Sequence, residues 1–137
     1  MSGTGGREAA FRTIASAGAL SAGAAVALGA FGAHGLRGVI SPEMLAVYES
    51  GVRYQMYHSL ALVAAGVTGL SVTACDRRLL VAASWAFGAG IVLFSGSLYA
   101  LALSGLRSLG AVTPAGGLAF IAAWAMFAGA LIRGERP

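Results

Sequence analysis

The chain has 137 residues, of which 58% are hydrophobic and only 10% are charged. An average soluble domain carries about 25% charged residues, so this composition excludes an ordinary soluble domain and indicates an integral membrane protein. The net charge of +4 comes from arginines that stand singly or in pairs near the ends of apolar runs, which excludes the clustered basic face typical of a nucleic-acid-binding protein.

The first predicted membrane-spanning helix covers about residues 13–34, after a short polar N-terminal tail at residues 1–12. No charged side chain occurs between Thr13 and Ala33, and a helix needs about 20 apolar residues to cross a bilayer. The run exceeds the apolar core of about 7–15 residues that a signal peptide carries, so we expect a retained helix. It ends in the segment LGAFGAHGL, which contains His34.

A short amphipathic helix is predicted next, at about residues 42–53. The segment Ser41–Glu43 is a typical helix start, and Glu49 and Arg53 then share a polar face opposite an apolar one. Such a helix lies in the membrane interface. We expect Gly51 to be a weak point between it and the next span.

Three further spans are predicted at about residues 55–74, 79–104 and 114–132. The third is long enough to tilt in the bilayer or to project from it. Thr113 and Pro114 suit the start of the last helix, because threonine caps free backbone amides and proline favours the first helical position. The expected architecture is therefore all-α, with residues 1–137 forming one four-helix transmembrane domain.

The arginines predict the orientation of this domain. An even number of spans puts both termini on one side, and that side then holds six of the nine arginines. Because positively charged loops stay in the cytoplasm, we expect a multi-pass protein of the cell (inner or plasma) membrane with both termini cytoplasmic.

Small residues recur along all four runs and predict close helix packing, because helices in lipid associate through close backbone approach. Among them, the packing positions expected are Gly29, Gly32, Gly88, Gly96, Gly116 and Gly117.

Polar side chains from four separate spans fall at one level, in the predicted outer half of the bundle. Because polar groups in lipid need partners and often mark functional sites, this level is the candidate site. One interpretation is a hydrogen-bonded structural cluster, and the other is a binding site for a ligand, an ion or a partner. The residues concerned are His34, Tyr54, Gln55, Tyr57, His58, Ser95, Ser97, Tyr99 and Thr113.

No cofactor is predicted. His34 and His58 are the minimum for a bis-histidine haem or metal site, but a protein metal site usually has three or four ligands, and no carboxylate lies in a span. No nucleophile elbow or phosphate loop is present, so an enzyme is not expected either.

The function expected is that of a non-enzymatic accessory or binding subunit in the lipid bilayer, serving a larger membrane complex or a lipid-like ligand. The alternative is a small channel or carrier gated through His34 and His58. The ligand, the partner, and whether the chain forms a homo-oligomer stay open at this stage.

Four ordered segments resemble the signatures of one family of small membrane proteins: LGAFGAHGL (28–36), YQMYHSLAL (54–62), GIVLFSGSLYAL (90–101) and TPAGGLAFIAAW (113–124). It is the domain of unknown function 423 family, which includes YgdD-like and YwdK-like proteins and has eukaryotic relatives. The resemblance covers nearly all of the chain after Ala17, with Ala123 standing where the family favours glycine. It implies a four-helix integral membrane protein and no catalytic assignment.

Overall fold

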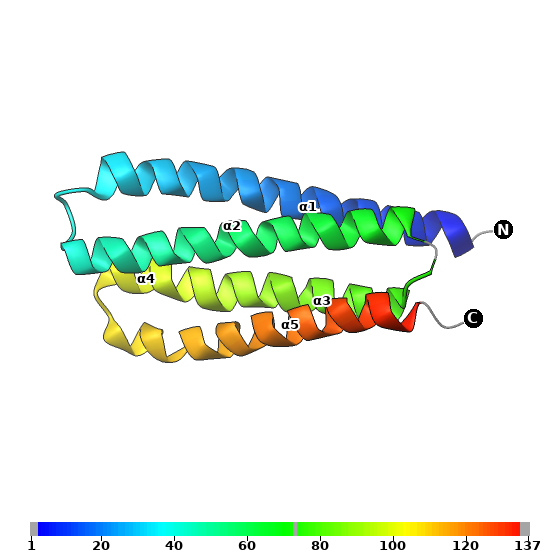
Figure 1. Ribbon diagram of the computed structural model, residues 1–137. Coiled ribbons are helices and arrows are strands. Elements are labelled where there is room, and N and C mark those ends of the chain that lie inside the picture. Colours follow the sequence, from blue (N-terminus) through cyan, green and yellow to red (C-terminus); the bar gives the residue numbers. More distant parts are fainter. Residues whose placement is uncertain (1–2, 73, 135–137) are drawn as a thin grey trace.

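The computed structural model describes residues 3–72 and 74–134, and within them every long element is a helix, arranged as four rods that lie side by side (Figure 1). The rods alternate in direction, so that α1 begins and α5 ends at the same end of the bundle. Their elements are α1 (Gly3–Phe31) with η1 (Gly32–Leu36), α2 (Pro42–Ser71), α3 (Arg77–Gly90) with η2 (Ile91–Ser95) and α4 (Gly96–Ser104), and α5 (Thr113–Arg133) after the short η3 (Arg107–Ala111).

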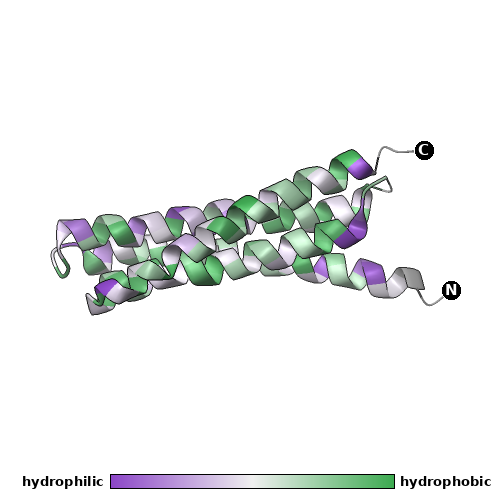
Figure 2. Ribbon diagram, turned by 90° about the horizontal axis from the view of Figure 1, so that it is seen from below, coloured by the Kyte–Doolittle hydropathy of each residue, from purple (hydrophilic) through white to green (hydrophobic). Residues whose placement is uncertain are grey.

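Three rods of the described chain are long and apolar enough to cross a membrane: Gly5–Leu36, Arg77–Ser104 and Arg107–Arg133. The remaining rod, α2, has 30 residues but is less apolar, because it carries Gln55 and His58 in addition to charged residues in its first half. Figure 2 shows the strongly hydrophilic ribbon towards the two ends of the bundle. The predicted all-helical fold is confirmed, and three of the four predicted spans have the expected apolar character.

The N-terminal segment differs from the expected polar tail. From Gly3 onward it is the beginning of α1, and the first two residues lie outside the described part. Phe11 is 2% exposed and packs against Gly69 of α2. Burial of this aromatic ring gives the first turns of α1 a packing contact that the charged composition of the segment concealed.

The predicted separate interfacial helix at 42–53 does not exist as such, because α2 runs without a break from Pro42 to Ser71. Ser41 caps its start by accepting a hydrogen bond from the backbone N–H of Met44 at 3.2 Å. Gly51 does not interrupt the helix. It lies against the Tyr99 ring, where a Cβ atom would come within 2.9 Å of Cε1, so a glycine is required there for close packing.

The third rod contains one irregular turn, since η2 is a π-helix between α3 and α4. Asp76 caps the start of α3 by accepting hydrogen bonds from the backbone N–H groups of Arg78 and Leu79, both at 3.1 Å. Gly105 ends α4 in the left-handed conformation, with φ of 72°, which glycine adopts without steric strain. A π turn inserts one extra residue into the helix and so rotates the side chains that follow it.

Thr113 does not cap α5, contrary to the expectation from sequence. Val112 occupies the cap position, and no side-chain cap is formed. Pro114 does lie in the first turn, as predicted. The Thr113 hydroxyl instead contacts Ser97 on α4, so its side chain joins two rods.

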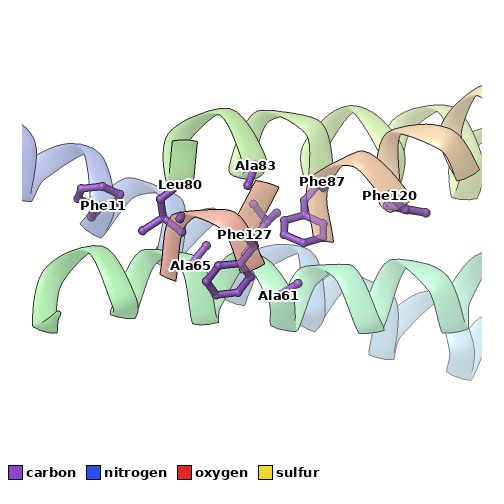
Figure 3. Packing of buried hydrophobic residues seen from close by; sticks show 11 residues of the cluster. Phe11, Ala61, Ala65, Leu80, Ala83, Phe87, Phe120 and Phe127 are labelled. Carbon is purple, nitrogen blue, oxygen red and sulfur yellow. The ribbon is translucent and has the colours of Figure 1, made fainter. Parts of the chain in front are cut away.

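The main core lies between α2, α3 and α5 and consists of phenylalanine rings packed against small residues (Figure 3). Phe87 and Phe127 meet edge to face with ring centroids 6.5 Å apart, and Ala61 and Ala65 of α2 lie beside them. The pairing of the rods is uneven: α1 packs almost entirely on α2, and α3 packs mainly on α5.

Glycines lie at the closest approaches between the rods. Gly116 lies against the backbone of Phe94, Gly32 against the Tyr48 ring and Gly29 against Val52, while Gly117 makes an ordinary contact with Phe94. Gly88 and Gly96 were expected at such contacts but face open space instead. Further close positions include Gly18, Gly51, Gly66, Gly69 and Gly90.

Candidate functional site

A chain of partly buried hydrogen bonds joins three rods and is the centre of the candidate site. The Tyr99 hydroxyl donates to Oε1 of Gln55 at 2.8 Å, and Nε2 of Gln55 donates to the carbonyl oxygen of Ser21 at 3.0 Å. The Ser59 hydroxyl donates to the Ser21 hydroxyl at 2.6 Å. We call Ser21, Gln55, Ser59 and Tyr99 the polar chain. Because each of its members finds a partner inside the protein, the chain meets the demand that lipid places on buried polar groups.

Tyr48 extends this arrangement towards the end of the bundle. Its ring is 1% exposed and lies 5.0 Å from the Tyr99 ring. Its hydroxyl donates to the carbonyl oxygen of Leu28 at 3.0 Å. α1 is therefore held to α2 by side-chain hydrogen bonds at two levels, one through Ser21 and one through Leu28.

His58 lies apart from the polar chain, within a group of aromatic rings. It is 5% exposed and stacks on Phe120, with ring centroids 3.4 Å apart and planes within 6°. The rings of Phe87 and Trp124 are 5.8 and 6.2 Å away. Since a carbonyl only accepts hydrogen bonds, Nδ1 donates to the backbone carbonyl of Tyr54 at 2.7 Å. The ring is thus held in place by one hydrogen bond and by aromatic packing.

Two serines of the third rod have contrasting surroundings. Ser97 donates to the carbonyl of Phe94 at 2.9 Å and shares a 2.8 Å hydrogen bond with Thr113, which links α4 to α5. Ser95 is 0% exposed, and its hydroxyl has no hydrogen-bond partner in the described structure. Ser95 is the last residue of η2, where the helical hydrogen-bond pattern is shifted.

The other predicted members lie at the periphery. Tyr54 and Tyr57 are 41% and 56% exposed, and the Tyr54 ring stacks on Phe94 at 4.5 Å. His34 is exposed in η1. His58 is next to Ser59 in the sequence, and Ser59 is hydrogen-bonded to Ser21 of α1. His34 lies 13 residues beyond Ser21, which is roughly 20 Å farther along the same rod. The structure therefore does not bring the two histidines together.

Sequence reasoning missed Ser21, Ser59 and Tyr48. Serine is common among the small residues of packed membrane helices, so Ser21 and Ser59 carried no separate signal. Tyr48 was assigned to the helix in the interface. The only available signal was its spacing: Tyr48, Gln55 and Ser59 fall on one helical face once the helix is taken as continuous.

The chemistry open to this site is that of helix association. The hydroxyl of Ser97 and the amide of Gln55 are engaged in hydrogen bonds between rods, and His58 is packed between rings. Within the part of the chain that the structure describes, no group of three or more His, Cys, Asp or Glu side chains is arranged to hold a metal ion.

The chain is similar to known membrane proteins. Residues 28–117 match the family described as "Protein of unknown function (DUF423)". The chain is 47% identical over 116 residues to the UPF0382 membrane protein YwdK of Bacillus subtilis, which covers 85% of this chain and 93% of YwdK. It is 50% identical over 109 residues to a UPF0382 membrane protein of Staphylococcus haemolyticus, which covers 80% of this chain and 86% of that protein. No solved structure matches the chain.

Proposed function

Because the chain belongs to the DUF423 family of membrane proteins, whose biochemical role is not established, we propose that it is a four-span subunit of the cell membrane that binds a partner or ligand without catalysing a reaction. The observation that carries the proposal is the polar chain. Its members are engaged with one another inside the bundle, so the interior serves assembly, and binding falls to the outer surface.

Crossing by all four rods is supported by the position of α2. At 1.5 Å per residue its 30 residues extend over about 45 Å, the thickness of a bilayer with its headgroups. It packs against α1 on one side and against α3, η2 and α4 on the other. Its polar Gln55, His58 and Ser59 are buried inside the bundle, which lowers the cost of placing them in lipid.

A cytoplasmic location of both termini is supported by the arginines. The end of the bundle where α1 begins and α5 ends carries five described arginines: Arg7, Arg12, Arg77, Arg78 and Arg133. Arg37, Arg53 and Arg107 lie towards the other end, and Arg136 is outside the described residues. The excess at the first end favours the cytoplasm for that end.

A binding role without catalysis is supported by the outer surface. Large apolar side chains point outward, among them Leu20 at 77%, Trp85 at 76% and Leu118 at 68% exposure. In a membrane such faces meet lipid chains, further copies of the chain, or helices of a larger complex. The alternative of a channel gated by His34 and His58 gains no support from the geometry, since the two rings share no common space.

Thiol labelling of the natural Cys75 tests the topology. Cys75 is the one cysteine of the chain and is partly exposed in the connection between α2 and α3. A membrane-impermeant maleimide should label it only after the cells are permeabilised. In a Cys75→Ser/Ser108→Cys variant, the cysteine in η3 should be labelled in intact cells. The opposite pattern would overturn the orientation, and labelling of both sites from one side would overturn four spans.

Native mass spectrometry of the protein after gentle extraction tests the binding role. We expect a stable additional mass, whether a protein subunit or a small ligand. A bare chain under every extraction condition, together with proton or solute flux in liposomes, would replace the proposal by a transport function.

A further inference from the structure

A groove runs along the bundle between the first half of α1 and α3. Its apolar section has a volume of about 390 Å³. Leu62 of α2 forms part of its lining. Along the two sides it is lined by Ala10, Ile14 and Ala17 of α1 and by Val81, Trp85 and Gly88 of α3.

The two hydroxyl groups along this section are turned back to their own helices. Thr13 donates to the carbonyl of Ala9 at 2.9 Å, and Ser84 donates to the carbonyl of Leu80 at 2.9 Å. The lining therefore offers hydrocarbon and little hydrogen-bonding capacity. It suits an apolar chain rather than water or a polar ligand.

The groove opens onto arginines at the end of the bundle where α1 begins. A second hollow of about 350 Å³ shares Ala10 and Val81 with the apolar section and adds Arg7, Arg77 and Arg78. A third, of about 490 Å³, is lined by the same three arginines with Cys75 and Asp76. The Asp76 carboxylate accepts hydrogen bonds from two backbone amides at the start of α3. This hollow is thus lined by three arginines and by one carboxylate that already serves as a helix cap.

We propose that this groove binds an anionic phospholipid, with the phosphate at Arg7, Arg77 and Arg78 and one acyl chain along the apolar section. Guanidinium groups recognise phosphate through paired, charge-assisted hydrogen bonds, and basic pockets between membrane helices on the cytoplasmic side bind lipid headgroups. The length fits as well. From Arg7 to Ala17 the groove extends roughly 15 Å, about half of the 30 Å hydrocarbon core, which is the depth of one leaflet.

The inference names the ligand class for the binding role proposed above and rests on the membrane insertion proposed there. A partner helix in the groove would need an acidic group placed at the three arginines, and a free phosphate would leave the apolar section without an occupant. The phospholipid satisfies both parts of the site with one molecule.

Native mass spectrometry of the full chain in detergent provides the test, with phosphatidylglycerol compared with phosphatidylcholine of the same acyl chains. The wild type should retain phosphatidylglycerol at lower lipid concentration than phosphatidylcholine. The variant Arg7→Gln/Arg77→Gln/Arg78→Gln should lose this preference, with affinity for phosphatidylglycerol lowered on the order of tenfold or more. The matched control Arg37→Gln/Arg53→Gln/Arg107→Gln makes the same charge change at the other end and should keep it.

Gly88→Phe tests the apolar section with all the arginines intact. A Cβ atom at Gly88 would meet no atom within 4 Å, and Gly88 lines the groove, so we expect the ring to enter the groove and to lower binding of phosphatidylglycerol while the bundle stays folded. Glycerol 3-phosphate, the soluble headgroup analogue, should not displace the lipid. Equal retention of the two lipids by the wild type, equal losses in both triple variants, unchanged binding in Gly88→Phe, or displacement by glycerol 3-phosphate would each overturn the inference.

This test separates the inference from the proposed function. The lipid comparison in detergent requires neither a protein partner nor a particular orientation. Failure of the lipid preference with correct Cys75 labelling rejects the lipid site alone, whereas reversed labelling rejects the topology whatever the lipid result.

Discussion

The Tyr99 hydroxyl on α4 and Oε1 of Gln55 on α2 are joined by a 2.8 Å hydrogen bond. Nε2 of Gln55 also donates a hydrogen bond to the backbone carbonyl of Ser21 on α1, so one side chain connects three rods. Measured hydrogen bonds between membrane helices contribute about 0.6 kcal/mol on average and about 1.7 kcal/mol at most. The value of this bond therefore lies in fixing the rotation of the helices as well as in its energy.

Tyr99→Phe should lower the free energy of unfolding in detergent by about 1 kcal/mol, because it leaves the Gln55 carbonyl oxygen buried without its donor. Gln55→Leu should cost at least as much, since the carbonyl of Ser21 loses a partner too. A double-mutant cycle, measured by denaturant titration followed by circular dichroism, should give a favourable coupling. The exposed Tyr57→Phe is the control, and additive losses in the cycle would show that the 2.8 Å contact contributes nothing.

Gly116→Ala should destabilise the bundle by about 1–3 kcal/mol, the usual range for an added atom in a close contact. The new methyl group would meet the backbone of Phe94, which cannot move away as a flexible side chain does. Gly96→Ala is the matched control. It places the same methyl group in open space, so stability should be unchanged or slightly raised through helix propensity. The measurement is the thermal unfolding of the two variants in the same detergent. Equal midpoint temperatures would refute the close contact at Gly116.

His58→Phe should be tolerated, because a phenyl ring keeps the stacking on Phe120 and the lost hydrogen bond goes only to a carbonyl of the same helix. His58→Ala should cost about 2 kcal/mol or more, because it leaves a cavity among the rings. Thermal stability of both variants distinguishes a packing role from a chemical one. A fully folded His58→Phe protein that loses its bound partner or ligand would assign His58 a role in binding.

Ser95→Ala should leave stability unchanged or raise it. The buried hydroxyl has no partner in the described structure, so its removal also removes the free-energy cost of burying a polar group without a hydrogen bond. Ser97→Ala should lower stability, because it breaks the link to Thr113. The two serines have the same chemistry and lie two positions apart, so the pair is its own control. A clear loss in Ser95→Ala, measured by denaturant titration, would show that the hydroxyl binds a group such as a water molecule.

The rods were predictable because charge-free runs of sufficient length have few alternatives to membrane helices. The level of the polar residues followed from counting along each run, and Gln55, Tyr99, Ser97 and Thr113 do form hydrogen bonds between rods at that level. The partners did not follow, because a partner depends on the rotation of each helix. The π turn of η2 changes that rotation ahead of Ser97 and Tyr99, and nothing in the sequence marks it.

The sequence does not reveal how each helix is rotated about its axis, and for the same reason the peripheral positions of His34 and Tyr57 could not be predicted. Counting placed them at the correct end of their rods, but it did not distinguish the face towards the protein from the face away from it. Tyr48 shows the converse. Its acidic neighbours suggested an interface, whereas its side chain packs under Tyr99 because Gly51 lets α4 approach α2 closely.

The uneven pairing of the rods bears on how the protein is made. α1 packs almost entirely on α2, and the close contacts of Gly18, Gly66 and Gly69 all lie within this first hairpin. Likewise α3 packs mainly on α5, and the start of α3 is fastened to the end of α5 by a 2.9 Å hydrogen bond from Asp76 N–H to the carbonyl of Ala130. During synthesis the N-terminal hairpin can thus complete its own contacts before the second hairpin has left the ribosome. We therefore expect biogenesis to proceed as the docking of two preassembled halves, with the polar side chains of α2 meeting their α4 and α5 partners only in that last step.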